Sequence, residues 1–370
     1  MKVLFITNIP VPYRMEFFNE LGKHVDLTVI FEAKRVQKTT FNWVDELISN
    51  YKAVFLSNGY IEEKKVDWKI LSYINKEEYD IIVATNYSYY TETVALLKLI
   101  FKRIPFVFEI DGAFIRKDNF LIRNIKHLIL SKPILYLSPS QSSDESLKYY
   151  GVNSSKIHRY PFTSVMQKDI LPRCITSIER NNLRKELGIK EKRMVLYVGQ
   201  FIFRKGVDVL LKAASLISNR EDTAVVLIGG KPTIEYESII KERKICNIYF
   251  HPFLDKKSLD KYFCSADTFV LPTREDTWGL VINEAMAYGL PIITTDNCLA
   301  GLELVENDIN GCIVPIDDEK TLAEKIDYIL ENENLRISMS QNNLEKIAYF
   351  TIEEMVNRHM EIFKHVLSNK

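Results

Sequence analysis

Residues 271–296 hold the side chains best suited to chemistry in this chain of 370 residues. The stretch reads LPTREDTWGLVINEAMAYGLPIITTD, in which a charged loop follows an apolar run and ends at Gly279. We expect a helix to begin at about Leu280. The first backbone N–H groups of a helix have no partner within it and carry the positive end of its dipole, so they suit a phosphate group. Gly279 would let such a ligand approach the backbone closely.

Two carboxylates flank this expected helix start. Glu284 falls in the first turns of the helix, where its carboxylate can accept hydrogen bonds from ribose hydroxyls. Asp276 stands eight residues earlier and can address a second polar group, such as the hydroxyls of a sugar. Judged on residue types alone, a surface loop with solvated charges in front of a core helix explains the stretch equally well.

The stretch resembles the signature of the family 4 retaining glycosyltransferases, whose GT-B fold places an active-site cleft between two facing Rossmann-like domains. The two acids that the family separates by seven residues fall on Asp276 and Glu284, with Asp where the family has Glu. The resemblance implies that Asp276 contacts the donor sugar, that Glu284 contacts the ribose, and that the backbone after Gly279 binds the diphosphate. It also marks further donor-binding residues, Thr277, Leu280 and Val281.

A second charged cluster, Arg204 and Lys205, lies on a loop that follows an expected strand over residues 194–198. Ligands of α/β domains bind at the carboxyl ends of such strands, and both cations suit phosphate. A solvated basic turn is the simpler alternative. The loop resembles the element with which the family holds the leaving diphosphate. Lys205 matches its lysine, while Gln200 stands at the place of its arginine, for which Arg204 is the candidate replacement.

Three further donor-binding candidates come from the resemblance. Phe253 and Leu254 lie in a segment similar to the one that receives the nucleobase through backbone groups in the family. Gly199 stands at the end of the expected strand that precedes Gln200.

The amino-terminal half offers candidates for the other side of the expected cleft. Asn8, Tyr13 and Arg14 follow the first expected strand, on a loop that two prolines stiffen. Arg14 could reach a phosphate, and a solvated arginine at a helix start is the alternative. Asp111 follows another expected strand, near the place where many relatives carry a histidine that contacts the donor sugar. Simple turn capping by Asp111 is an equal alternative.

Short apolar runs alternate with helical patterns along most of the chain, which indicates parallel sheets in α/β domains. The expected strands are residues 3–7, 26–31, 80–85, 106–109, 134–138, 194–198, 223–228, 248–251, 268–271 and 291–294. The expected helices are residues 13–21, 143–150, 179–187, 207–218, 235–244, 259–263, 280–288, 321–331 and 353–367.

The alternation is interrupted once, by a polar and irregular stretch. We therefore expect a Rossmann-like domain over residues 1–165, joined by the C-terminal helix at 351–370, a second such domain over 190–350, and a linker at 166–189. By the resemblance, the first domain binds the acceptor and the second binds the nucleotide sugar.

The segment from Arg116 to Lys132 mixes basic residues with apolar residues at helical spacing. A basic amphipathic helix is what an anionic membrane surface attracts. The alternative is a core helix with a solvated basic face.

Composition narrows the class of protein. The formal net charge is zero, which argues against nucleic acid as a partner. Five scattered cysteines without a C-x-x-C pair predict a reduced, cytoplasmic protein without a zinc site. No apolar run approaches the ~20 residues that span a bilayer. We expect no metal and no cofactor, and a cytoplasmic location or a peripheral one on the inner face of the membrane.

The resemblance implies a retaining, metal-independent hexosyltransferase. It would move a sugar from a nucleotide diphosphate sugar, UDP-linked in the first instance, to a saccharide or polyprenyl-linked saccharide in surface polysaccharide biosynthesis. A nicotinamide-dependent dehydrogenase is disfavoured because no G-x-G-x-x-G follows an expected strand. A non-catalytic nucleotide-sugar-binding partner of another transferase and a nucleotide-sugar epimerase of the GT-B group remain alternatives.

Overall fold

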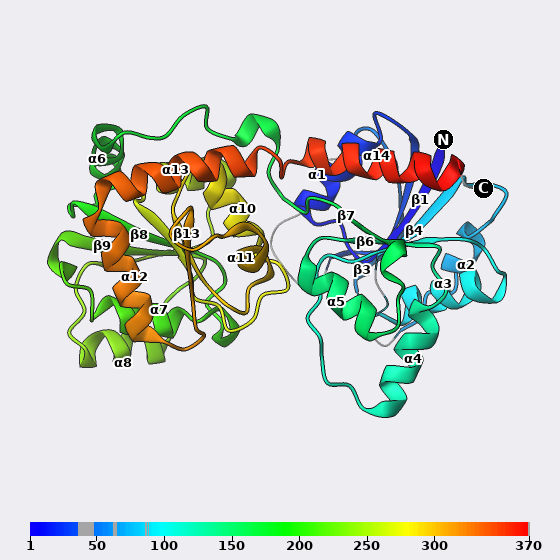
Figure 1. The fold of residues 1–370 in the computed structure, drawn as a ribbon, viewed down its shortest axis with the longest axis horizontal. Coiled ribbons are helices and arrows are strands. Elements are labelled where there is room, and N and C mark those ends of the chain that lie inside the picture. Colours follow the sequence, from blue (N-terminus) through cyan, green and yellow to red (C-terminus); the bar gives the residue numbers. More distant parts are fainter. Residues whose placement is uncertain (36–47, 62–64, 86, 88, 369–370) are drawn as a thin grey trace. The chain divides into compact units, whose positions relative to one another are not determined.

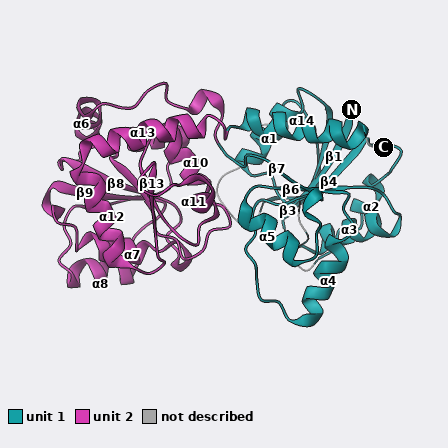
Figure 2. Ribbon diagram, viewed as in Figure 1, with its two compact units in different colours: residues 1–164, 351–370 teal, residues 165–350 magenta. Residues whose placement is uncertain are grey.

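The computed structural model describes residues 1–35, 48–61, 65–85, 87 and 89–368 (Figure 1). The chain divides into two compact units (Figure 2). Unit 1 contains residues 1–164 and 351–370, and unit 2 contains residues 165–350. Each unit is a parallel sheet covered by helices, as in the α/β fold class that the sequence predicts.

The sheet of unit 1 has the strand order β3-β2-β1-β4-β5-β6-β7, and its strands pair in parallel throughout. Strands β1 and β4 are buried almost along their whole length, which explains their continuous apolar sequences. The strands are β1 (Lys2–Thr7), β2 (Asp26–Arg35), β3 (Lys52–Tyr60), β4 (Ile81–Ala84), β5 (Val107–Glu109), β6 (Leu135–Ser138) and β7 (Ile157–Arg159).

Six described α-helices belong to unit 1. They are α1 (Pro12–Leu21), α2 (Ile70–Tyr73), α3 (Tyr90–Phe101), α4 (Phe120–Leu130), α5 (Gln141–Tyr149) and α14 (Ile352–Ser368). The last of them comes from the end of the chain and packs beside α1 (Figure 1). Phe363 of α14 lies against Phe5 of β1, and His359 lies against Phe17 of α1, with ring centroids 4.8 Å apart in the second pair.

A buried charged cluster joins α1, β5 and α14. Arg14 pairs with Glu109 at 2.5 Å and also with Asp111, and His359 Nε2 lies 3.2 Å from the other Glu109 oxygen. Arg14, Glu109 and His359 are each at most 2% exposed. Burial would raise the pKa of Glu109, but Arg14 and His359 outweigh it and lower this pKa from 4.5 to about 2.

We expect Glu109→Gln to destabilise unit 1 by about 3 kcal/mol, because removing one partner of a buried ion pair leaves the other charge uncompensated. Since the pKa of Glu109 is lowered in the folded state, its contribution to the free energy of unfolding is complete above about pH 4.5. This contribution is lost as the pH falls toward 2. Hydrogen exchange of the α14 amides measures both effects. Glu361→Gln, which removes the exposed pair with Arg358 on the same helix, is the control and should change stability by less than ~1 kcal/mol. Equal hydrogen-exchange protection of α14 in the two variants would contradict a stabilising role of the buried Glu109 cluster.

The sheet of unit 2 has the strand order β10-β9-β8-β11-β12-β13 and is also parallel throughout. Its strands are β8 (Arg193–Val198), β9 (Thr223–Ile228), β10 (Ile248–His251), β11 (Thr268–Leu271), β12 (Ile292–Thr295) and β13 (Gly311–Val314). Its helices are α6 (Ser177–Glu186), α7 (Val207–Ala214), α8 (Ile234–Glu242), α9 (Lys256–Ser265), α10 (Leu280–Ala287), α11 (Leu299–Leu304), α12 (Glu319–Glu331) and α13 (Glu333–Ile347).

Residues 166–189, expected as a linker, are part of unit 2. Helix α6 begins with a capping box between Thr176 and Glu179. From the same helix the buried Arg184 donates to the backbone oxygen of Ser265 at 2.8 Å and pairs with Asp267 at 2.5 Å. These contacts fix α6 to α9 and the start of β11, so this segment is an integral layer of unit 2.

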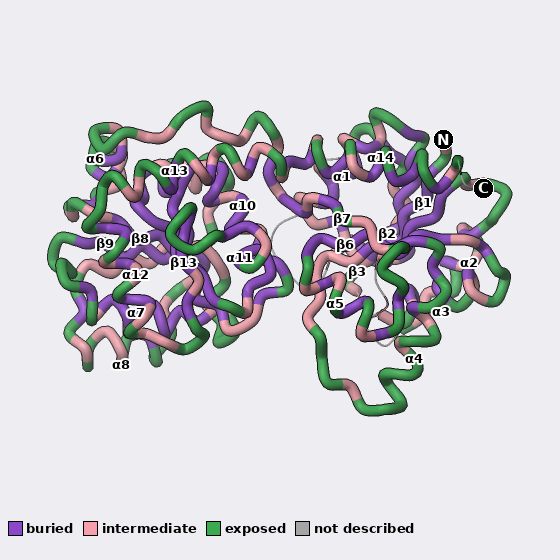
Figure 3. The backbone as a smooth tube through the Cα atoms, in the orientation of Figure 1, coloured by how far each residue is buried: buried purple, intermediate pink, exposed green. Residues whose placement is uncertain are grey.

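Within the segment from Arg116 to Lys132, residues Phe120–Leu130 form α4, and most residues of this helix are exposed (Figure 3). Of its apolar residues, only Ile129 and Leu130 pack against the core. Leu130 is the one buried residue of α4. The alternative of a core helix with a solvated basic face is therefore wrong. None of the helices in the described residues is long and apolar enough to cross a membrane.

Candidate functional site

Two loops of unit 2 meet at the carboxyl ends of adjacent strands. The short 3₁₀ turn η3 (Phe203–Lys205) follows β8, and the loop of residues 272–279 follows β11, which pairs with β8. This adjacency brings Lys205 to Asp276, and the Lys205 ammonium forms an ion pair with Asp276 Oδ2. Arg204 Nη1 lies 3.6 Å from the other Asp276 oxygen. The two clusters that the sequence singled out separately thus form one charged site.

Arg274 clamps the two loops together. Its guanidinium pairs in a bidentate manner with Asp208 at 2.8 and 2.9 Å, and it donates to the backbone oxygen of Phe203 at 2.6 Å. The backbone N–H of Arg274 donates to the Arg204 oxygen at 2.8 Å. In the sequence, Arg274 is only one of the charges of this loop, because nothing there shows that Asp208 faces it.

A glycine is required where the loops touch. Gly206 has a positive φ of 68°, and a Cβ there would lie 1.9 Å from the backbone oxygen of Pro272. The close approach of the backbones fixes the position of Lys205 relative to Asp276. Asp276 is 7% exposed and the Lys205 side chain 14%, whereas the Arg204 side chain is 44% exposed.

Helix α10 starts where the sequence predicts, directly after the charged loop. Gly279 has a φ of 101°, and a Cβ there would meet the Cys298 sulfur at 2.8 Å. The buried Trp278 indole donates to Asn283 Oδ1 at 2.9 Å, which ties the loop to the first turn of the helix. The backbone oxygen of Trp278 accepts from Ala300 at 2.9 Å. The amino-terminal end of α10 is therefore held rigidly beside Asp276.

The other donor-binding candidates differ in their distance from this charged site along the sheet. Gly199 and Gln200 follow β8, and the Tyr197 hydroxyl donates to the Gln200 backbone oxygen at 3.0 Å. Phe253 and Leu254 follow β10, at the sheet edge with β9 between them and β8. On and near α10, the residues Glu284, Leu280 and Val281 are half-buried, and Thr277 is exposed.

In unit 1 the structure brings together three of the four candidates. The Tyr13 hydroxyl donates to Asp111 at 3.0 Å, and Arg14 pairs with the same carboxylate. The alternative of a solvated Arg14 is wrong, because this side chain is buried and holds Glu109 as well. These two ion pairs favour a structural role for Arg14 over contact with a phosphate. Asn8 lies earlier on the same loop, where its side chain accepts from the N–H of Ile9 at 2.7 Å.

Comparison with known proteins places this geometry in a family. Residues 179–346, which include both loops and α10, match the sequence model described as glycosyl transferases group 1. This segment, which makes up most of unit 2, belongs to the glycosyl transferases group 1 family. Lys205, Asp276 and Glu284 all lie inside the matched region.

Two relatives show the similarity at the level of the amino-acid sequence. An N,N'-diacetylbacillosaminyl-diphospho-undecaprenol alpha-1,3-N-acetylgalactosaminyltransferase from Campylobacter jejuni is 24% identical over 71% of this chain and 69% of its own length. An uncharacterized 41.2 kDa protein in the cps region of Klebsiella pneumoniae is 25% identical over 94% of this chain and 93% of its own length.

Solved structures show the same fold over the whole chain. Anabaena HepE, crystallised in complex with UDP and glucose, superposes with a TM-score of 0.77 at 17% identity, covering 99% of this chain and all of that one. The glycosyltransferase therefore has the GT-B fold, with its two parallel Rossmann-like sheets. Within the described residues, no group of three or more His, Cys, Asp or Glu side chains is arranged to hold a metal ion.

Proposed function

We propose that this glycosyltransferase moves a hexose from a nucleotide diphosphate sugar, UDP-linked in the first instance, to a saccharide or polyprenyl-linked saccharide acceptor, with retention of configuration. The observation that carries the proposal is the Lys205–Asp276 pair, clamped at the carboxyl ends of β8 and β11 beside the start of α10. The names of two relatives, one that acts on a diphospho-undecaprenol-linked sugar and one from a cps region, support such an acceptor and pathway.

The chemical demand of the reaction fits the charges of this site. As the nucleotide departs, its diphosphate gains negative charge while the anomeric carbon becomes oxocarbenium-like. Lys205, Arg204 and the first N–H groups of α10 would stabilise the diphosphate electrostatically, because they are fixed before the reaction begins. Asp276 would hold the donor sugar and Glu284 the ribose. A donor phosphate oxygen, on the leaving-group side, would take the proton of the acceptor hydroxyl.

A nucleotide screen tests the proposal. We expect UDP and a UDP-sugar to raise the thermal unfolding midpoint in buffer with excess EDTA, since no metal is needed to bind the diphosphate. At a concentration of 100 Kd the stabilisation amounts to about 2.7 kcal/mol. UMP, which lacks the second phosphate, is the control and should stabilise much less.

Two results of that screen would overturn parts of the proposal. Loss of both UDP binding and sugar transfer in EDTA would show that the metal-free scheme is wrong. Binding of a nucleotide sugar without transfer or donor hydrolysis would favour the alternative of a non-catalytic partner. Asp276 and Gln200, which both depart from the family pattern, are the residues that support this alternative.

We also propose that α4 attaches the protein to an anionic membrane surface on the inner face of the cytoplasmic membrane. Several of its apolar side chains are exposed: Phe120, Leu121, Ile122, Ile125 and Leu128. Lys117 and Lys132 are exposed on either side of the helix. Lys126 is instead paired with Asp118 at 2.7 Å, so it contributes less than the sequence alone indicates. An apolar face bordered by cations suits the boundary between lipid headgroups and acyl chains.

Co-sedimentation with vesicles measures this attachment. We expect binding to vesicles with anionic lipid, a weakening at raised salt, and little binding to neutral vesicles. Lys117→Ala with Lys132→Ala removes two cations at about 1 kcal/mol each, so affinity should fall roughly 30-fold. The matched control is a double variant of unit 2, Lys190→Ala with Lys261→Ala, which removes two exposed lysines from that unit. Absence of binding to either type of vesicle would leave a soluble acceptor as the better hypothesis.

A further inference from the structure

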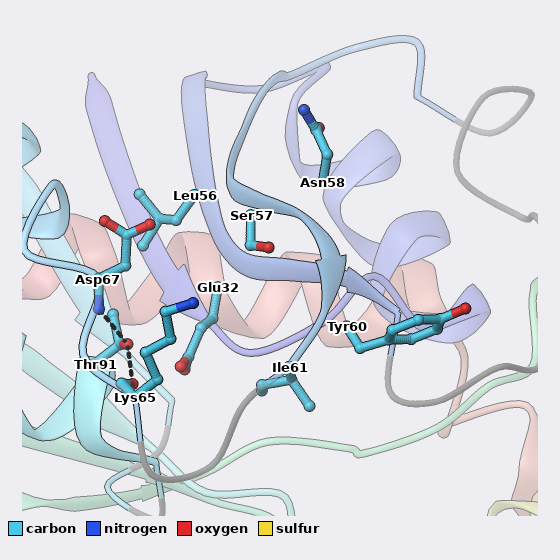
Figure 4. Close-up of a pocket in the computed structure, with 9 residues that line it drawn as sticks. All are labelled: Glu32, Leu56, Ser57, Asn58, Tyr60, Ile61, Lys65, Asp67 and Thr91. Atoms are coloured by element: carbon cyan, nitrogen blue, oxygen red, sulfur yellow. Dashed lines mark hydrogen bonds between the residues drawn. The ribbon is translucent and has the colours of Figure 1, made fainter.

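A polar cavity lies in unit 1, and Arg14, Glu109 and Asp111 are not among the residues that line it. It has a volume of about 290 Å³ and is formed by the ends of β2 and β3, the segment of residues 65–67 and the first turn of α3 (Figure 4). These elements meet at the carboxyl edge of the parallel sheet, where α/β domains bind their ligands. The volume is at the small end of ligand pockets, which suits a single ring rather than an extended molecule.

A buried carboxylate without a complete set of partners opens into this cavity. Glu32 of β2 is 6% exposed and lines the cavity, and its Oε2 has no hydrogen-bond partner within the described part of the chain. Figure 4 shows its carboxylate between Lys65 and Ile61 in this view. A buried polar atom left without a partner costs free energy, so a ligand that supplies a donor there would be bound favourably.

A second carboxyl group stands close to the first. Glu92 of α3 is 2% exposed, and the backbone of Tyr89 acts on its carboxyl group as a hydrogen-bond donor. Burial, together with the neighbouring Glu32, raises the pKa of Glu92 to about 8. Burial likewise raises the pKa of Glu32, a hydrogen bond from the Thr91 side chain opposes this shift, and the charge of Asp67 adds to it. The raised pKa of Glu92 favours its neutral form, which reduces the negative charge beside Glu32.

The rest of the wall is ordered and mixed in character. The N–H of Asp67 donates to Thr91 Oγ1 at 3.1 Å, and the Thr91 hydroxyl donates to the Lys65 backbone oxygen at 3.3 Å, as the dashed lines in Figure 4 mark. These bonds tie the wall to α3. Tyr60, which is 38% exposed, and Ile61 add apolar surface. Carboxyl groups that bind hydroxyls, beside apolar surface that can cover C–H groups, match the two kinds of surface on a sugar ring.

We propose that this cavity, with Glu32 as its principal contact, binds a neutral sugar unit of the acceptor. The proposal rests on the proposed function, since it identifies where unit 1 would hold the molecule that receives the transferred sugar. The Glu32 carboxyl would accept from ring hydroxyls, and the ring would pack against Tyr60. A small ammonium compound is the competing ligand, because carboxylates also bind cations.

Saturation-transfer NMR with methyl glycosides of glucose, galactose and N-acetylglucosamine, in the full chain, tests the cavity. We expect saturable binding of at least one glycoside and a loss of affinity of at least tenfold in Glu32→Gln, which removes the strongest acceptor. Tyr60→Ala, at an exposed ring, should weaken the same glycoside without loss of folding. Glu78→Gln, at an exposed glutamate outside the cavity, is the control and should leave affinity unchanged.

The outcomes separate this proposal from the proposed function. Two results would overturn the cavity as the acceptor site: no glycoside binding at all, or the same glycoside affinity in the wild type, Glu32→Gln and Tyr60→Ala. If UDP still binds in unit 2, either result leaves the proposed sugar transfer intact. Binding of methylamine in preference to every glycoside would overturn the neutral sugar. Glycoside binding lost in Glu32→Gln while UDP stabilisation is unchanged would support the proposal. Glycoside binding at Glu32 in a protein that binds no nucleotide would overturn the proposed function alone.

Discussion

Replacing Lys205 by alanine is expected to lower kcat by a factor of about 10² to 10³. The ammonium group is one of the fixed charges that would stabilise the departing diphosphate, and removal of one such group from a preorganised site has an effect of this size. The change also leaves the nearly buried Asp276 with Arg204 alone, at 3.6 Å. Initial rates of sugar transfer, or of donor hydrolysis where the acceptor is unknown, measure the loss.

Lys192→Ala provides the matched control for this prediction. Lys192 lies in the same unit and forms an ion pair with Asp222 at 3.0 Å, but its side chain is 77% exposed. Its removal should leave kcat unchanged. A Lys205→Ala protein that is folded and retains the wild-type rate would remove Lys205 from the reaction.

Replacing Glu284 by alanine is expected to weaken UDP binding by about 1.5–3 kcal/mol, or roughly 10- to 150-fold in Kd. This is the range for hydrogen bonds to a charged group, here the carboxylate that would accept from the ribose hydroxyls. Asp276→Ala should instead lower turnover with a smaller effect on UDP affinity, because Asp276 would contact the sugar rather than the nucleotide. Calorimetric titration with UDP separates the two variants.

The exposed Glu237 of α8 supplies the control for the calorimetry. Glu237→Ala should bind UDP as the wild type does. Equal UDP affinities for the wild type and Glu284→Ala would show that Glu284 does not hold the ribose.

Much of the fold could be predicted because buried parallel strands leave a strong pattern in the sequence. Strands such as β1 and β9 are apolar runs buried on both faces, and they were expected within one residue of their observed ends. β3 was not predicted. It is one of the two edge strands in the sheet of unit 1 and is mostly half-buried or exposed. Its sequence KAVFLSNGY shows neither a continuous apolar run nor a regular alternation.

Helix α13 was missed for a related reason. Its sequence ENLRISMSQNNLEKI is largely polar, and its contact with unit 2 depends on a few buried residues, Met339, Ser340, Asn343 and Ile347. The buried Asn343 donates to the backbone oxygens of Leu290 and Asn310. A polar residue that bonds to distant backbone groups cannot be recognised as a core residue from the sequence.

The site residues of unit 2 could be found one by one, but their pairing could not. Lys205 and Asp276 are 71 residues apart, and they meet because β8 and β11 are neighbours in the sheet. The strand order, the clamp by Arg274 and the close approach at Gly206 are properties of the folded unit. In unit 1 the same holds for Arg14, whose partners come from β5 and from the segment that follows it.

A crystal structure of the protein with bound UDP tests the central claim most directly. The account predicts the diphosphate within hydrogen-bond distance of Lys205 and of the first N–H groups of α10, with the ribose hydroxyls on Glu284. A nucleotide bound elsewhere on the protein, with the Lys205–Asp276 pair and the start of α10 untouched, would contradict it.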